Sequence, residues 1–213
     1  MIADRTAEPT LADRAYRDLE RLIVTLGLPP GAVMSESTLG EELQMGRTPL
    51  REALQRLASE GLVTTMPRRG MMITPIDLSE MIAIIETRKV LDAIVVKGAA
   101  EHATGSDRSR ISEGLAGLDA PGERFMEADA KLDHAIWAAA PNRHAVRASR
   151  PLHTHCRRFW FKYRNDEDLL RSAELHKAVA KAVLDGDPVR AVERSDKLND
   201  YLTLFTKHIL IRG

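Results

Sequence analysis

The N-terminal part of the chain opens with one helical pattern of apolar residues. In LADRAYRDLERLIVTLGL, which begins at residue 11, apolar positions recur at steps of three and four, as on the inward face of an amphipathic helix. The expected inward side chains are Leu11, Ala15, Leu19, Leu22, Ile23 and Leu26. Gly27 and the following Pro29, Pro30 and Gly31 predict the end of this helix.

Two shorter helical patterns follow closely. SESTLGEELQM supplies a cap at Ser35 or Ser37 and an apolar face of Leu39 and Leu43. MGRTPLREAL, residues 45–54, predicts a third helix with Thr48 as its cap and Pro49 in its first turn. Its expected inward stripe is Leu50, Ala53, Leu54 and Leu57. The polar side chains expected to project from another side near its start are Arg47, Thr48, Arg51 and Gln55.

The next segment, TTMPRRGMMITPI, predicts a β-hairpin, because apolar and polar residues partly alternate on either side of a Pro-Arg-Arg-Gly tip. Helix, turn, helix and hairpin make a winged helix-turn-helix, whose second short helix fits the major groove of DNA. Arg47 and Arg51 are then expected to face DNA, with Arg68 or Arg69 in or beside the minor groove. The alternatives are solvated arginines at the hairpin tip and, for Arg56, a surface pair with Glu52.

From about residue 77 the pattern becomes helical over long stretches. The first such helix, LSEMIAIIETRKVLDAIVVKGAAEHA, is expected to turn inward Met81, Ile84, Ile85, Val90, Leu91, Ile94 and Val95. Further helices are predicted over residues 107–118, 122–140, 143–165, 168–185 and 188–211. The predicted fold is mainly α: an N-terminal winged helix-turn-helix with a small β-hairpin wing, then a C-terminal antiparallel all-α bundle. The expected parts are a flexible N-terminus (1–10), the DNA-binding domain (11–75) and an effector-binding and dimerisation domain (76–213).

The segment LHTHCRRFWFKYR, residues 152–164, interleaves basic and aromatic residues. Such a segment could stack single-stranded nucleic acid. At helical spacing, however, Phe159 pairs with Tyr163 and Trp160 with Arg164, which favours aromatic packing inside the bundle. His153 and His155 are two residues apart, lie on different helix faces and make a poor pair of metal ligands.

Composition and charge narrow the class of protein. Of 213 residues, 44% are hydrophobic and 29% charged, and no apolar run approaches the ~18 residues of a membrane span. The N-terminus shows no secretory signal, so a cytoplasmic protein is expected. A single cysteine, Cys156, excludes an internal disulfide framework and a cysteine zinc site. The net charge is zero, which argues against indiscriminate binding to polyanions, although residues 44–70 concentrate five arginines against two glutamates.

The stretch LPPGAVMSESTLGEELQMGRTPLREALQRLASEGLVTTMPRRGMMIT resembles the DNA-binding domain of GntR-family bacterial transcription regulators. The family pattern is a Pro-Gly turn, a Leu-Ala-rich helix, Ser-Arg-Thr-Pro-Val-Arg-Glu-Ala-Leu, then Glu-Gly-Leu-Val and a Gly-tipped wing. The resemblance implies operator contacts by Arg47, Thr48 and Arg51, and a wing formed by Arg68, Arg69 and Gly70. Two positions depart from it: Gln44 replaces a turn glycine, and Gly46 replaces a serine whose hydroxyl could bind phosphate or cap the helix.

The helical part is similar to the effector-binding domain of the FadR-type branch of this family. IETRKVLD matches its opening Glu-x-Arg-x-x-x-Glu helix, and ELHKAVAKAVLDGDPVRAV matches a later His-containing segment. Many such domains hold a metal on one aspartate and three histidines, and the metal or a carboxylate-bearing ligand is the effector. When the chain is aligned with that pattern, Asp129 and His176 stand at the expected aspartate and histidine positions. Asp133 and Leu198 stand where the family has histidines, and His134 is one residue away from the helix face that carries the ligands.

Three interpretations of this site stay open. Asp129 and Asp133, one helical turn apart, could join His176 in an oxygen-rich site for a divalent metal ion, the one candidate cofactor. A metal-free pocket could instead hold an anionic ligand on Arg88 and His176, while the aspartates bind hydroxyls or a cationic group. In the third interpretation the aspartates are solvated and His176 is a packed, hydrogen-bonded histidine.

The sequence therefore predicts a DNA-binding transcription regulator and no enzyme. Its operator affinity is expected to depend on a small-molecule effector, an organic acid, bound in the helical domain. Because one recognition helix reads only a few base pairs, we expect a homodimer on a palindromic double-stranded operator, with no membrane partner. A metal-dependent hydrolase using Asp129, Asp133 and His176 would leave residues 35–75 unexplained. A helical scaffold that binds protein would show no salt-dependent DNA affinity.

Overall fold

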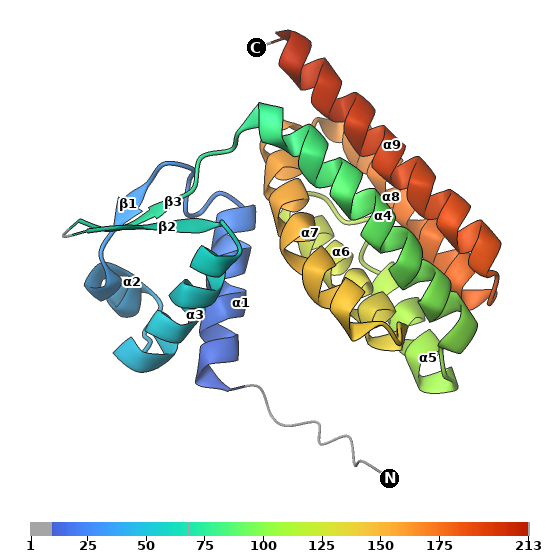
Figure 1. Cartoon of the computed structure of the whole chain (residues 1–213), viewed down its shortest axis with the longest axis horizontal. Coiled ribbons are helices and arrows are strands. Elements are labelled where there is room, and N and C mark those ends of the chain that lie inside the picture. The colour runs from blue at the N-terminus through green and yellow to red at the C-terminus, as the bar shows by residue number, and fades with distance from the viewer. Residues whose placement is uncertain (1–9, 68, 213) are drawn as a thin grey trace. The chain divides into compact units, whose positions relative to one another are not determined.

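The structure, a computed structural model, describes residues 10–67 and 69–212. The chain divides into two compact units between Ile76 and Asp77. The N-terminal unit carries three helices and three short strands, and the C-terminal unit is helical (Figure 1). Across the described ranges, no helix combines the length and the apolar character needed to span a bilayer.

The N-terminal unit is a winged helix-turn-helix, as the sequence predicts. Its elements are α1 (Leu11–Val24), β1 (Val33–Met34), α2 (Glu36–Glu42), α3 (Arg47–Ser59), β2 (Val63–Met66) and β3 (Gly70–Ile73). The strands form an antiparallel sheet in the order β1-β3-β2, with Thr64 opposite Met72 in the hairpin. The two-residue strand β1 is an addition to the predicted hairpin. The helices and the sheet share one core, which includes Leu19, Ile23, Leu39, Leu50, Leu57 and Ile73.

The boundaries of α1 follow from local chemistry. The Thr10 hydroxyl accepts a hydrogen bond from the Asp13 backbone N–H, and the Asp13 carboxylate accepts one from the Thr10 backbone N–H, so a capping box starts the helix at Leu11. The helix ends at Val24, before the predicted Gly27. Leu11 was expected in the core but is 66% exposed, because it lies on the first turn beyond the packed stripe.

The start of α3 differs from the prediction. Its N-cap is Gly46, with φ −67° and ψ 154°, and not Thr48. The Leu50 backbone N–H already donates to the Gly46 carbonyl oxygen at 3.3 Å, so Thr48 and Pro49 lie inside the first turn. Since glycine has no side chain, no side-chain hydrogen bond caps this helix. The turn before it places Gln44 at φ 50°, in the left-handed region that favours the glycine usual in the family.

The base of the wing requires a glycine. Gly70 has φ +96°, and a Cβ atom at this position would lie 2.3 Å from the carbonyl oxygen of Met34. Strand β1 therefore approaches the start of β3 too closely for any side chain at residue 70.

The C-terminal unit is an all-helical bundle. Its elements are α4 (Leu78–His102), α5 (Gly105–Leu115), α6 (Glu123–Ala139), α7 (Arg143–Tyr163), α8 (Asp166–Leu184) and α9 (Pro188–Arg212). Helix α4 packs against α6, α7, α8 and α9, which places it at the centre of the unit. In Figure 1 it lies alongside α7 and α9. Residues that face inward from α4 are therefore placed to meet side chains from several helices.

The orientation of α4 corrects one prediction. Val90 and Ile94, expected to face inward, are 64% and 43% exposed, whereas Arg88 and Asp92 are buried. The helix carries apolar residues on nearly all sides, so the spacing of its apolar residues does not predict which face turns toward the core. On the face that turns inward, Arg88 pairs with Asp92, and the Asp92 carboxylate also accepts hydrogen bonds from α7 and α9.

The aromatic segment of α7 packs within the bundle, as its spacing predicts. The ring centroids of Phe159 and Tyr163 lie 5.2 Å apart, and those of Phe159 and Phe205 lie 5.6 Å apart. The Arg164 guanidinium carbon is 5.6 Å from the centroid of the Trp160 ring. These contacts account for the aromatic residues without a nucleic-acid ligand.

Candidate functional sites

The first candidate site is the outward side of α3. Arg47, Thr48, Arg51 and Gln55 are all exposed, as the sequence predicts. On the opposite side Leu50, Ala53 and Leu57 are at most 1% exposed and belong to the core. One side of the helix is therefore fixed in the core, while its other side leaves polar groups exposed at the surface.

Arg51 forms an ion pair within its own unit. Its Nε atom lies 2.6 Å from Oε2 of Glu36, in the first turn of α2. The Arg51 side chain is 64% exposed and that of Glu36 is 39% exposed, so this is a surface ion pair of small net energy. Both residues border a hollow of about 440 Å³ between the helices and the hairpin. Glu36 thus orients the guanidinium without burying it.

The wing lies beside this surface. Arg69 is exposed, and its backbone N–H donates to the Met66 carbonyl oxygen at 3.0 Å in the hairpin turn. Gly70 starts β3 and borders the same hollow as Arg51. Arg68, which the sequence also assigns to the wing, lies outside the described residues.

Arg56 forms an ion pair within the N-terminal unit, with Asp13 in place of the expected Glu52. Its Nη1 atom lies 2.8 Å from Oδ1 of Asp13, and its guanidinium carbon lies 4.1 Å from the centroid of the Tyr16 ring. The Tyr16 hydroxyl in turn donates to Glu60 at 2.7 Å. Arg56 therefore joins α3 to α1 through contacts inside the unit.

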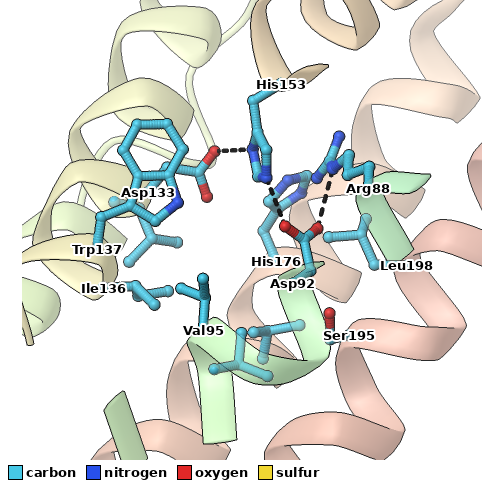
Figure 2. Close-up of a pocket in the computed structure, with 13 residues that line it drawn as sticks. Arg88, Asp92, Val95, Asp133, Ile136, Trp137, His153, His176, Ser195 and Leu198 are labelled. Carbon is cyan, nitrogen blue, oxygen red and sulfur yellow. Dashed lines mark hydrogen bonds and ion pairs between the residues drawn. The ribbon is translucent and has the colours of Figure 1, made fainter. Parts of the chain in front are cut away.

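The second candidate site is a cluster of charged and polar side chains inside the helical bundle, and Figure 2 shows five of them: Arg88, Asp92, Asp133, His153 and His176. Helix α4 supplies Arg88 and Asp92, α6 supplies Asp129 and Asp133, α7 supplies His153 and Arg157, and α8 supplies His176. Six are buried, and the His176 side chain is only 11% exposed. We call these seven side chains the charged cluster. They include the four residues that the sequence predicts for the effector site, Arg88, Asp129, Asp133 and His176.

Asp92 is the acceptor at one end of the charged cluster. Its Oδ1 atom lies 2.8 Å from Nε2 of His153 and accepts a hydrogen bond from the Ser149 hydroxyl at 2.9 Å. Its Oδ2 atom accepts from Nε of Arg88 at 2.9 Å and from the side-chain amide of Asn199 at 3.3 Å. Four groups from three helices therefore satisfy this buried carboxylate.

Arg157 joins the two aspartates of α6. Its Nε atom donates to Oδ2 of Asp129 at 2.5 Å, and its Nη2 atom donates to Oδ2 of Asp133. Oδ2 of Asp133 also lies 2.6 Å from Nδ1 of His153. Because His153 contacts Asp92 through its other ring nitrogen, it links the carboxylates of α4 and α6, as the dashed lines in Figure 2 show.

The electrostatics follow from these contacts. Burial acts to raise the pKa of the Asp92 carboxyl, but His153 and Arg88 outweigh it and hold that pKa well below its usual range. Burial and Arg88 act to lower the pKa of His153, yet Asp92 and Asp133 raise it above its usual value of 6.5. Each ring nitrogen of His153 faces a carboxylate oxygen, so the protonated imidazole can donate to both.

The bundle leaves little empty space around the charged cluster. Two cavities of about 20 Å³ each lie beside it, both bordered by Arg88 and His176. Each is large enough for about one water molecule. The first also reaches Trp137 and Leu198, which Figure 2 labels on its wall.

The charged cluster does not fit a metal ion. Within residues 10–67 and 69–212, no group of three or more His, Cys, Asp or Glu side chains is arranged to hold one. The ring nitrogens of His176 contact oxygen atoms: Nδ1 lies 2.8 Å from the Ser172 carbonyl oxygen, and Nε2 lies 2.8 Å from Oδ1 of Asp129 as an ion pair. Leu198 supplies no ligand at the family's histidine position. The arrangement favours the metal-free interpretation of the pocket.

Three members of the charged cluster are absent from the predicted effector residues: Asp92, His153 and Arg157. The sequence pairs His153 only with His155, which lies on another face of the helix. The available signal was a spacing of four residues, since Ser149, His153 and Arg157 follow one face of α7 just as Arg88 and Asp92 do on α4. The third interpretation is wrong for the aspartates, because Asp129 and Asp133 are only 4% and 8% exposed.

The chain thus combines a winged helix-turn-helix, a fold that can place a helix in the major groove of DNA, with a helical unit that has a polar centre. Comparison with known families agrees: residues 11–73 match the family described as "Bacterial regulatory proteins, gntR family", and residues 83–199 match the FCD domain. The chain belongs to the GntR family, and its C-terminal unit is an FCD domain.

Individual relatives agree with this assignment. The chain is 31% identical over 112 residues to the Nta operon transcriptional regulator of Aminobacter aminovorans, covering 53% of each chain. It is 28% identical over 117 residues to the HTH-type transcriptional repressor RspR of Escherichia coli (strain K12), covering 54% of this chain and 51% of that protein. The matched stretch thus spans about half the length of these relatives.

Solved structures support the fold. McbR/YncC of E. coli aligns with a TM-score of 0.80 at 20% identity, covering 94% of this chain and 99% of that chain. A GntR regulator from Rhodococcus sp. RHA1, titled putative, aligns with a TM-score of 0.70 at 22% identity, covering 93% and 97%. At these identities the likeness concerns the fold alone.

Proposed function

We propose that this GntR-family regulator binds a specific operator through α3 and the wing, and that a small organic acid bound in the FCD domain controls its operator affinity. The observation that carries the proposal is the division of α3 into a core-facing apolar side and an exposed polar side at its N-terminal end. An α-helix with such an end fits the major groove and brings side chains to base edges.

The proposed contacts divide into two kinds. Arg51 and Gln55 are placed further along the exposed side of α3 and are proposed to reach base edges, whereas Arg47 and Thr48 at its start are proposed to hold phosphates. Arg69 and Gly70 are proposed to bring the wing to the minor groove, together with Arg68. The lack of a side-chain cap at Gly46 supports phosphate binding at this helix end, because the first-turn N–H groups are not taken by a side chain.

The operator is proposed to be palindromic and the protein a homodimer, since two recognition helices are needed to read enough base pairs. Exposed apolar side chains on α4 and α9, including Val90, Ile94 and Val189, are compatible with a contact between copies. Effector binding would then shift the population between dimer geometries that fit the operator and geometries that do not.

An organic acid is the effector class proposed for the charged cluster. Two arginines and two histidines there face three aspartates, so basic groups outnumber acidic ones. Arg88 borders both cavities and is the proposed anchor for a ligand carboxylate, with His176 beside it. The aspartates are proposed to act through these basic groups, because each already accepts hydrogen bonds or ion pairs within the cluster.

The test begins with selection of a binding sequence from randomised duplex DNA. Dissociation constants are then measured on the selected and a scrambled duplex at several salt concentrations, with and without organic acids that raise the melting temperature. We expect tight, salt-dependent binding to the selected duplex and a changed affinity when the acid is present. Equal affinity for both duplexes would contradict operator recognition. Equal operator affinity with and without a bound acid would contradict effector control.

A further inference from the structure

The inference concerns the centre of the charged cluster, where Arg157 meets two acidic side chains. Asp129 and Asp133 are one turn apart on α6, and both direct an oxygen toward the same guanidinium. The side chains of all three residues are at most 11% exposed. Two buried carboxylates this close repel each other strongly unless a cation lies between them.

Arg157 supplies that cation from within the chain. Its guanidinium donates through two different nitrogen atoms to two different carboxylates, which is the bridging role that a divalent ion has in an oxygen-rich site. The third candidate ligand is also engaged, since Nε2 of His176 lies against Oδ1 of Asp129. Every group that could bind a metal ion at this place therefore already has a partner.

We propose that the Arg157 guanidinium is an internal replacement for a metal ion, so that this FCD domain is assembled without a divalent metal. Asp129, Asp133 and His176 are not arranged around a metal position while they contact Arg157 and each other. Removal of the guanidinium would free the two carboxylates and the imidazole to turn toward the space it leaves, and together they are a donor set suited to Mn²⁺ or Zn²⁺. The proposal makes no use of DNA binding, so its test stands apart from that of the operator.

The experiment compares the full-length protein with Arg157→Ala, both prepared without a histidine tag and dialysed against a chelator. Metal content after exposure to excess Mn²⁺ or Zn²⁺ and removal of unbound ion is measured by elemental mass spectrometry, and melting temperature is measured in parallel. For the wild type we expect no retained metal and no shift. For Arg157→Ala we expect a lower melting temperature, about one retained ion per chain, and recovery of part of the lost melting temperature when the ion is added.

Two variants make the result specific. Arg147→Ala removes an exposed arginine of the same helix and should behave as the wild type. Arg157→Ala combined with Asp129→Asn should lose the gained metal. If Arg157→Ala does not fold, Arg157→Met keeps more of the side-chain volume and takes its place.

Two outcomes would overturn the proposal. One is a wild-type protein that retains about one metal ion per chain and loses melting temperature when a chelator removes it. The other is a folded Arg157 variant that gains no metal, since the guanidinium would then not be occupying a metal position.

Discussion

The arginines of the two units differ in what surrounds them. Arg51 on α3 is 64% exposed and has one carboxylate beside it, whereas the Arg157 side chain is 7% exposed and lies between two. An exposed charge keeps most of its hydration and can exchange its neighbour for another anion at small cost. A buried charge depends on its partners, and removal of any one leaves an uncompensated charge. The same residue type is therefore suited to the proposed operator contact in one unit, whereas in the other it holds buried carboxylates together.

The largest expected effect is on the stability of the fold, and it comes from removing a buried charge. Asp92→Ala removes the acceptor shared by Arg88, His153, Ser149 and Asn199, and we expect a loss of about 3–5 kcal/mol in the free energy of unfolding. Urea denaturation of both proteins measures it. Asp200→Ala is the matched control, because Asp200 pairs with Lys89 at the surface and should cost less than about 1 kcal/mol. Equal losses for the two variants would refute the distinction.

The next largest effect is on DNA affinity, and it comes from removing an exposed arginine of α3. Arg51→Ala should leave the melting temperature nearly unchanged but weaken operator binding by roughly 1–3 kcal/mol and relax the preference for the selected sequence. Arg47→Ala, at the proposed phosphate contact, should weaken binding to matched and scrambled duplexes alike. Binding isotherms on both duplexes separate the two. Similar losses on each duplex for both variants would contradict the division into base and phosphate contacts.

The third prediction concerns how the stability of the fold depends on pH. All seven histidines lie between residues 102 and 208, so histidine titration affects the C-terminal unit. His153 and His176 have raised pKa values in the fold, so their stabilisation is complete below about pH 6.5 and is lost as pH rises through the folded values. Asp92 and Asp129 have lowered pKa values in the fold. The stability that these two carboxylates contribute is therefore present above about pH 3.9 and is lost only as pH falls further.

Stability should therefore decline on the alkaline side by about 1.4 kcal/mol for each unit by which an imidazole pKa is raised. Chemical denaturation from pH 6 to about 9 measures this slope. His153→Gln should flatten it, whereas His208→Gln, an exposed change on α9, should not. An unchanged slope in His153→Gln would show that this histidine does not carry the dependence.

The smallest expected effect is local to the turn before α3. Gln44→Gly should stabilise the protein by about 0.5–1 kcal/mol, because glycine adopts φ 50° without the strain of a side chain. Gly70→Ala should do the opposite, since its Cβ would meet the Met34 carbonyl oxygen. Melting temperatures of the two variants should move in opposite directions, and a drop for Gln44→Gly would contradict the strain argument.

The two units also differ in how many of their candidate site residues can be predicted from the sequence. The recognition surface is contiguous along one short helix, so spacing alone assigned Arg47, Thr48, Arg51 and Gln55 to the exposed side. The cap of that helix was misplaced because Thr-Pro is a common start, while Gly46 has no side chain to mark it. The charged cluster draws on four helices, and a sequence does not state which polar faces will meet. The family register points to Asp129, Asp133 and His176. The four-residue spacing shows that Arg157 and Asp92 lie on polar helix faces, but only the packing of α4, α6 and α7 shows that these faces meet.

The two water-sized cavities beside Arg88 have a consequence for rates. The organic acid proposed as effector is larger than either cavity, so it would enter only after neighbouring helices have moved apart, and opening would precede its capture. At rising effector concentration the observed association rate should then level off at the frequency of opening, whatever the intrinsic affinity. The time in which such a regulator responds would be set by the motion of its own helices, and the supply of ligand would decide only how fully it responds.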